Sequence, residues 1–127
     1  LDTDPGEHRT GLFHGDYQTH NLLYDEAGRL VAVVDWEIAG IGPVGMDVGW
    51  LAMMVDQSCW HPERAEVALV SEEPARIRRW YEAATGRGLA HFDWYQALAC
   101  YRYGAIAGFN LHLHRSGRRV DPANWAL

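Results

Sequence analysis

At 127 residues the chain has the size of one domain that can bury a hydrophobic core. Its net charge of −6 argues against nucleic acid as a partner, and no apolar run approaches the roughly 20 residues that cross a bilayer. We therefore expect a cytoplasmic protein with no membrane partner. All 11 basic residues are arginine, which excludes any chemistry that needs a lysine of this chain. Cys59 and Cys100 lack metal-ligand spacing, so we expect buried, reduced thiols.

The first predicted elements form a β-hairpin. Strand-like runs at residues 21–24 and 30–34 flank the segment Asp25–Arg29, which has a glycine where a tight turn needs one. Before the hairpin, the apolar stretch 10–13 leads into a polar loop with the sequence HGDYQTHN at residues 14–21.

From residue 43 onward the pattern is helical. Pro43 suits the first turn of a helix whose apolar residues recur at helical spacing up to Val55. A short helix is also predicted after Pro62. Another helix is predicted over residues 74–86, where Gly86 acts as the C-terminal stop. We expect this helix to bury Ile77, Trp80, Tyr81 and Ala84.

A long helix is predicted from Asp93, which can cap it, to the pair Ser116-Gly117. One face is expected to carry Trp94, Leu98, Tyr101, Ala105 and Phe109. The aromatic residues Trp94, Tyr101 and Tyr103 either pack in the core or face a small-molecule pocket. The predicted fold class is α+β and mainly helical, a small hairpin followed by a helical bundle.

The hairpin brings the polar loop next to a second acidic residue. A turn centred near Gly28 places Asp35 opposite Asn21, and directly opposed residues have Cβ atoms about 4.5–5.5 Å apart. An amide oxygen and a carboxylate at that separation can share a Mg²⁺ ion, which completes its shell with substrate phosphates and water. Asp16 lies on the loop over the same end and is free to accept a proton from a substrate hydroxyl. The alternative is that these side chains only cap turns.

His14-Gly15-Asp16, followed after four residues by Asn21 and later by Asp35-Trp36-Glu37, resembles the catalytic core of the aminoglycoside phosphotransferase family. These are small-molecule kinases with a protein-kinase-like fold. Their H-G-D-x-x-x-x-N loop resembles the H-R-D-x-x-x-x-N loop of protein kinases, and their D-[WF]-[EG] resembles D-F-G. The resemblance continues through Gly40–Pro43 to Asp47–Trp50, which is similar to the family segment G-x-G-D-P-x-x-D-L-A.

The resemblance implies roles for five residues. Asp16 would be the catalytic aspartate, which orients and deprotonates the acceptor hydroxyl. Asn21 and Asp35 would coordinate the Mg²⁺ ions that bridge the nucleotide phosphates. His14 and Asp47 would support the catalytic loop, although Asp47 is equally well explained as a favourable acid in the first turn of a helix.

The family also implies parts that this chain does not carry. Its glycine-rich loop and phosphate-binding lysine belong to an N-terminal lobe, whereas 13 residues precede His14 here. We therefore expect residues 1–127 to be the C-terminal, catalytic lobe of a protein-kinase-like fold, with the N-terminal nucleotide-binding lobe absent and the cofactor-binding residues unassigned. The implied function is Mg²⁺-dependent transfer of the γ-phosphate of a nucleotide, ATP or GTP, to a small-molecule hydroxyl acceptor. The isolated lobe is expected to be inactive.

Two other functions remain open. A pseudokinase-like binding or scaffold domain would keep the fold without turnover, and His14, His20 and Asp16 could form a hydrolytic metal site. The glycines at 40–45 fit a dinucleotide-binding pattern, but that fold needs a parallel strand after the helix, which the sequence does not offer. His112 and His114 diverge on a helix and are not expected to share a metal.

Overall fold

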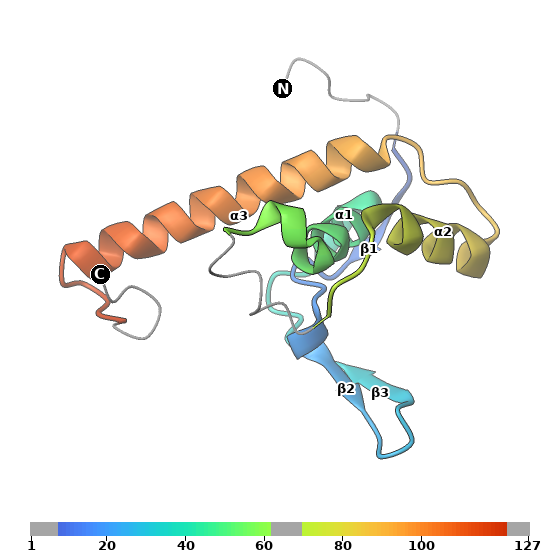
Figure 1. The fold of residues 1–127 in the computed structure, drawn as a ribbon, viewed down its shortest axis with the longest axis horizontal. Helices are drawn as coiled ribbons and strands as arrows, with labels where there is room; N and C mark the ends of the chain where they lie inside the picture. The colour runs from blue at the N-terminus through green and yellow to red at the C-terminus, as the bar shows by residue number, and fades with distance from the viewer. Residues whose placement is uncertain (1–7, 62–69, 122–127) are drawn as a thin grey trace.

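A computed structural model describes residues 8–61 and 70–121 of the chain. Within these ranges the fold is mixed α+β, with two small antiparallel sheets and three α-helices (Figure 1). The elements in chain order are β1 (Thr10–Phe13), η1 (Thr19–Asn21), β2 (Leu22–Tyr24), β3 (Leu30–Val33), β4 (Gly40–Pro43), α1 (Gly45–Val55), η2 (Gln57–Cys59), α2 (Pro74–Thr85) and α3 (Phe92–Arg115). The short helix predicted after Pro62 lies outside the described residues.

The hairpin of β2 and β3 projects away from the helices (Figure 1). Asp25 builds its turn, because the Asp25 Oδ1 atom accepts hydrogen bonds from the N–H groups of Ala27 (3.0 Å) and Arg29 (2.8 Å). The Asp25 N–H group in turn donates to the Arg29 carbonyl at 3.0 Å. The predicted loop between the two strands is therefore confirmed.

The pairing of the hairpin differs by one residue from the prediction that Asp35 faces Asn21. The N–H group of Val34 donates to the Asn21 carbonyl at 2.9 Å, so Asp35 lies beyond the paired residues. The turn is centred at Ala27, one residue before Gly28, since Tyr24 pairs with Leu30 and Asp25 bonds to Arg29. A bulge between Leu23 and Tyr24, where the ladder skips one residue of β3, then brings the pairing to within one residue of the prediction. Past the ladder, Asp35 turns into the left-handed region with φ of 67°.

A second sheet, formed by β1 and β4, was not predicted. Phe13 pairs with Gly40, and a Cβ atom on Gly40 or Gly42 would lie 3.0 or 2.9 Å from the Phe13 ring. Pro43 ends β4, so the prediction that it begins a helix is wrong; the helix starts at Gly45. The antiparallel pairing of β4 also rules out a dinucleotide-binding loop here, since that loop follows a strand of a parallel sheet.

α1 is the centre of the core and packs against both α2 and α3. The main buried cluster consists of Val48, Ala52, Val55, Ile77, Leu89, Phe92 and Tyr95. α1 and α3 approach closely because glycine lies at the contact. A Cβ atom on Gly49 would lie 2.5 Å from the backbone of Tyr95, and one on Gly45 would lie 2.3 Å from its ring.

α2 begins and ends almost as predicted, with Gly86 in the left-handed conformation directly after it (φ 66°). The prediction of its buried face is only partly right. Ile77 is buried and Tyr81 is partly buried, but Trp80 and Ala84 are exposed. α2 contacts α1 along one narrow face, which leaves the Trp80 side in solvent.

α3 begins at Phe92, and His91 rather than Asp93 occupies the N-cap position. Its buried residues are Phe92, Tyr95 and Ala99, whereas the predicted face fails at Tyr101 and Phe109, which are 64% and 63% exposed. Phe109 is exposed because the C-terminal half of α3 extends beyond the other described elements (Figure 1). Tyr101 is exposed because it lies about 200° around the helix from the buried Ala99. Neither α3 nor any other helix in the described ranges is long and apolar enough to span a membrane.

Candidate active site

The loop between β1 and β2 is anchored by the buried imidazole of His14, which is 1% exposed. Its Nδ1 atom accepts the N–H group of Asp16 at 3.2 Å. The Nε2 atom therefore carries the proton and donates to the carbonyl of Val34 at 2.8 Å. The Trp36 ring covers the imidazole, with 4.7 Å between the ring centroids. One side chain thus ties the loop to the end of the hairpin.

This arrangement argues against the alternative of a metal-dependent hydrolase. Both ring nitrogens of His14 are engaged in hydrogen bonds, and His20 is exposed. Residues 8–61 and 70–121 contain no cluster of three His, Cys, Asp or Glu side chains that could hold a metal ion.

Asp47, in the first turn of α1, holds the same loop from the other side. Its Oδ2 atom accepts the N–H group of His14 at 2.6 Å, and its Oδ1 atom accepts that of Gly15 at 2.9 Å. Gly15 has φ of 89°, and a Cβ atom there would lie 2.7 Å from the carbonyl of Ile38. The turn therefore requires glycine at position 15 and an acceptor at position 47. Asp47 combines both roles considered from the sequence, a helix N-terminal acid and a partner of the loop.

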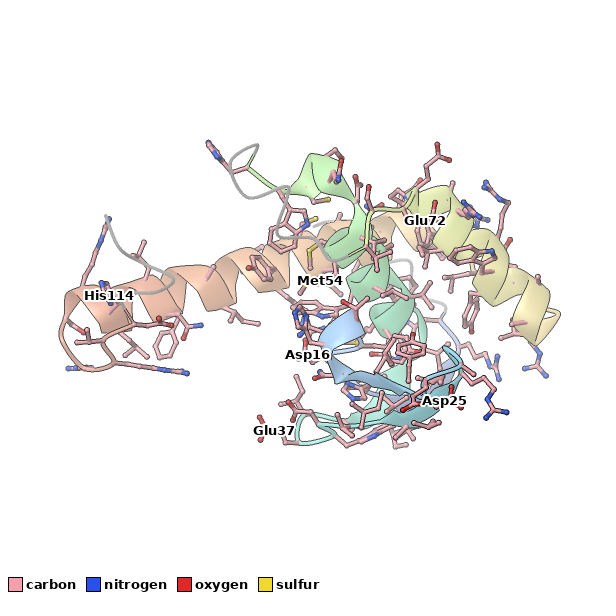
Figure 2. The ribbon with its side chains drawn as sticks, turned by 60° about the horizontal axis from the view of Figure 1, so that its bottom comes forward. Asp16, Asp25, Glu37, Met54, Glu72 and His114 are labelled. Atoms are coloured by element: carbon pink, nitrogen blue, oxygen red, sulfur yellow. The ribbon has the colours of Figure 1, made fainter. Side chains whose placement is uncertain are left out.

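Asp16 lies near α1 at the base of the hairpin, whereas Asp25 lies at the far turn (Figure 2). Three side chains donate to its carboxylate. Gln18 Nε2 contacts both oxygens at 2.9 and 2.8 Å, Trp50 Nε1 contacts Oδ1 at 3.0 Å, and Asn21 Nδ2 contacts Oδ2 at 3.0 Å. The Asn21 amide also donates to the Asp16 carbonyl at 2.9 Å. The carboxylate is consequently fixed in one orientation.

Asn21 and Asp35 offer the oxygen atoms that a magnesium ion prefers. The Nδ2 atom of the buried Asn21 is used by Asp16, which leaves its Oδ1 atom as an acceptor. Asp35 is exposed, and its carboxylate makes no hydrogen bond or ion pair with another described residue. One amide and one carboxylate do not enclose an ion, but they fit Mg²⁺ that takes its other ligands from phosphates and water.

A cavity of about 460 Å³ opens beside Asp16. Most of its lining is apolar or aromatic, and it includes Trp50, Met54, Trp60, Arg102, Tyr103 and Ile106. Of the three aromatic residues considered from the sequence, Tyr103 lines this cavity. Trp94 packs against the main core, and Tyr101 points into solvent. The volume is in the range of a small-molecule site.

Sequence reasoning missed three residues that surround Asp16. Gln18 and Trp50 donate to it, and Trp50 lies three residues after Asp47, one helical turn along α1. Arg102 of α3 stacks over the Trp50 ring with its Cζ atom 5.1 Å from the centroid, and its Nη2 atom lies 3.3 Å from the Gly15 carbonyl. The helical spacing from Asp47 was a usable signal for Trp50. Arg102 is 87 positions from Gly15, and no local pattern predicts that contact.

The two cysteines are free thiols, but they do not match the expectation that they are buried. Both are exposed residues, and their Sγ atoms lie 3.8 Å apart, between η2 and α3. Partial burial of the thiol raises the pKa of Cys59 to about 12, and the neighbouring Cys100 and Asp56 add to the effect. At neutral pH Cys59 is therefore a protonated thiol and a poor nucleophile.

Comparison with known proteins identifies the family. The sequence profile of the phosphotransferase enzyme family matches residues 1–98. The chain belongs to this family. A stretch of 47 residues is 38% identical to acyl-CoA dehydrogenase family member 10 of Mus musculus, which corresponds to 36% of this chain and 4% of that protein.

The phosphotransferase family fold is also supported by a solved structure. The chain is similar to the crystal structure of a candidate aminoglycoside phosphotransferase from Ralstonia eutropha JMP134, with a TM-score of 0.70 and 27% identity over 88% of this chain. The chain spans 36% of the length of that protein. The predicted resemblance to the aminoglycoside phosphotransferase family is thereby confirmed.

Proposed function

We propose that this chain is the catalytic lobe of a small-molecule kinase that transfers the γ-phosphate of ATP or GTP to a hydroxyl group. The observation that carries the proposal is the setting of Asp16, whose carboxylate borders a cavity and is fixed by donors from three side chains. Phosphoryl transfer depends almost entirely on positioning and on stabilising charge, so a rigidly held carboxylate beside a ligand-sized cavity suits it.

In this mechanism Asp16 accepts a hydrogen bond from the acceptor hydroxyl and orients the oxygen toward the phosphate. It takes the hydroxyl proton as the new P–O bond forms and the bond to the leaving nucleotide oxygen breaks. The bonds from Asn21 and Trp50 support the role, because a carboxylate that rotates freely would hold the hydroxyl less well.

Asn21 and Asp35 are the proposed metal ligands. Mg²⁺ held there would neutralise charge on the nucleotide phosphates. His14 and Asp47 are proposed as supporting residues, since their hydrogen bonds join the loop that carries Asp16 to the hairpin end that leads to Asp35. A kinase is favoured over a pseudokinase-like scaffold because the chain retains the three side chains, Asp16, Asn21 and Asp35, proposed to act on the acceptor and the metal.

The proposal is tested with the complete gene product by comparing Asp16→Asn with Asp35→Asn. ADP release from MgATP is measured with a panel of sugars, amino alcohols, aminoglycosides and hydroxy acids, and nucleotide binding is measured by calorimetry. We expect Asp16→Asn to lower turnover by about 10²–10⁴-fold or more while nucleotide affinity stays nearly unchanged. Asp35→Asn is expected to weaken MgATP binding as well, because it removes a charged ligand.

Glu26→Gln, which removes an exposed carboxylate from the hairpin turn, is the matched control and should behave as wild type. Near-normal turnover of Asp16→Asn would refute the assignment of the base. Unchanged MgATP affinity in Asp35→Asn would refute the metal site.

A further inference from the structure

We infer that the acceptor is an alcohol with an apolar body and a single anionic group bound by Arg102, rather than a polycation such as an aminoglycoside. This inference rests on the proposed kinase function, because it assumes that the cavity beside Asp16 receives the acceptor.

The walls of the cavity argue for an apolar body. Trp60, Tyr103 and Ile106 line it together with Met54 and Val70, and two of these rings pack edge to face with 5.0 Å between their centroids. Contact with such walls stabilises an apolar ligand by removing its surface from water. A ligand with several ammonium groups would lose hydration against the same walls without gaining partners.

The charges on the cavity wall are few. Among the described lining residues, Asp16 is the one carboxylate and Arg102 the one guanidinium. The Asp16 carboxylate is assigned to the reacting hydroxyl, so no described acidic side chain in the cavity is left for an amino group. Recognition of a polycation requires several such acids, whereas Arg102 provides a site for a single anion.

Arg102 differs from the arginines that are ion-paired on the surface. Arg29, Arg76 and Arg78 each pair with a carboxylate four residues away, whereas the described residues supply no carboxylate partner for Arg102. Its guanidinium has five N–H donors and, among the residues that the structure describes, makes one hydrogen bond, of 3.3 Å to the Gly15 carbonyl. The planar fork of the remaining donors matches a carboxylate or a phosphate.

Trp50 sets the separation between the two ends of such an acceptor. Its Nε1 atom donates to Asp16, and its ring face lies against Arg102. An anion beside Asp16 would be repelled by that carboxylate. The hydroxyl therefore lies at the edge of the indole and the anionic group beside the guanidinium over its face, joined by an apolar segment.

The test uses the complete gene product, MgATP and three matched acceptor series. These are ω-hydroxy acids of increasing chain length, with the diols and the amino alcohols of the same lengths, and kanamycin is added as the polycation. We expect kcat/KM to be highest for a hydroxy acid, lower for its diol, and lowest for its amino alcohol and for kanamycin.

Variants of Arg102 connect this preference to the guanidinium. Arg102→Gln is expected to lower kcat/KM for the hydroxy acid about 10–100-fold, which corresponds to the loss of hydrogen bonds to a charged group. The kcat/KM for the diol should change by about twofold at most. Arg102→Lys keeps the charge but not the planar fork, so it should retain only part of the preference. Arg115→Gln removes an exposed arginine from the same helix and should change nothing.

Three results would overturn the inference. The first is kanamycin or an amino alcohol as the best acceptor. The second is an equal loss for all acceptors in Arg102→Gln, which would make Arg102 a support for the loop alone. The third is a rise in KM for MgATP in that variant, which would place the nucleotide at Arg102.

Calorimetric binding of the hydroxy acids without nucleotide separates this inference from the kinase proposal. If no acceptor is phosphorylated but the hydroxy acids bind the wild type and fail to bind Arg102→Gln, the kinase function fails and the ligand class stands. If phosphoryl transfer occurs without any preference for the anionic series, the ligand class fails and the kinase function stands.

Discussion

The Asp16 carboxylate has four positions for incoming hydrogen bonds, and all of them are taken in the structure. Trp50 and Asn21 each use one oxygen, and Gln18 Nε2 contacts both. An acceptor hydroxyl must therefore replace one of these donors. Gln18 is the natural choice, because it lies two residues from Asp16 on the same loop and lines the cavity. Trp50 is a buried residue of α1, so its side chain cannot move away from Asp16 as easily.

This difference predicts opposite effects for two substitutions in the complete enzyme. Gln18→Ala removes the donor that the hydroxyl displaces, so we expect KM for the acceptor to stay the same or fall by a few-fold while kcat changes little. Trp50→Phe removes one of the two donors that hold Asp16 while the hydroxyl is bound, and it should lower kcat by about tenfold, the value of one net hydrogen bond. Steady-state kinetics with one accepted alcohol makes the comparison. A larger loss of kcat in Gln18→Ala than in Trp50→Phe would contradict it.

At the scale of elements, the close contact between α1 and α3 depends on glycine. Gly49 faces the backbone of Tyr95 with no room for a Cβ atom, whereas Gly108 of α3 has no heavy atom within 4 Å of that position. The same substitution should therefore have opposite effects at the two sites.

We expect Gly49→Ala to lower the free energy of unfolding by about 1–3 kcal/mol, because the added methyl group forces the helices apart. Gly108→Ala is expected to raise it by about 0.5–1 kcal/mol, because alanine loses less backbone entropy in an exposed helix. Urea unfolding of the two variants and the wild type provides the measurement. A Gly49→Ala variant as stable as wild type would mean that α1 and α3 are not held at this distance.

The elements differ in how far the sequence predicts them. The ends of α2 and the hairpin loop were predicted correctly, because Pro74, Gly86 and Asp25 act through local backbone geometry. The pairing of the hairpin was wrong by one residue because neither the exact centre of the turn nor the bulge that follows it has a strong local signature. β4 was not predicted, and the prediction placed its last residue, Pro43, in a helix, since the partner strand of β4 lies about thirty positions earlier in the chain. The prediction of buried faces was wrong where a helix extends past its neighbours, as α3 does.

The residues of the candidate site also differ in how far the sequence predicts them. His14, Asp16, Asn21, Asp35 and Asp47 follow from a motif within a short stretch of sequence, and the structure brings the first three and Asp47 into one hydrogen-bonded group. Arg102 and the cavity arise only from the packing of α3 on α1, which no motif contains.

At the scale of the whole molecule, the sheet side of the chain exposes apolar side chains. Leu12 and Ile41 pair across β1 and β4 and are 60% and 75% exposed. Leu30, Val31 and Ile38 of the neighbouring hairpin region are exposed as well. Contiguous exposed apolar residues mark a contact surface. We propose that this surface packs against the nucleotide-covering lobe of the whole protein.

Residues 1–127 alone are therefore expected to lack phosphoryl transfer and to bind MgATP weakly. The chain has no lysine to grip the phosphates, and metal contacts in an open cleft are screened by water. Nucleotide binding and ADP release are compared between these residues and the complete gene product, and sedimentation reports self-association through the apolar surface. A double variant, Leu12→Ser with Ile41→Ser, should reduce that association. Micromolar MgATP binding or measurable phosphorylation by residues 1–127 alone would contradict the expectation.

The left-handed backbone at Asp35 predicts which residues can replace it in related sequences. At φ of 67° most side chains crowd the backbone, and glycine, asparagine and aspartate are the residues that tolerate it best. Foldability alone therefore accepts glycine or asparagine at position 35 as readily as aspartate, so the proposed metal ligation is the one role that requires the carboxylate. His14, in contrast, is retained by folding itself, because the loop and the hairpin both bond to it. In a lineage that abandons the reaction, we expect Asp35 to drift to glycine or asparagine while His14 persists.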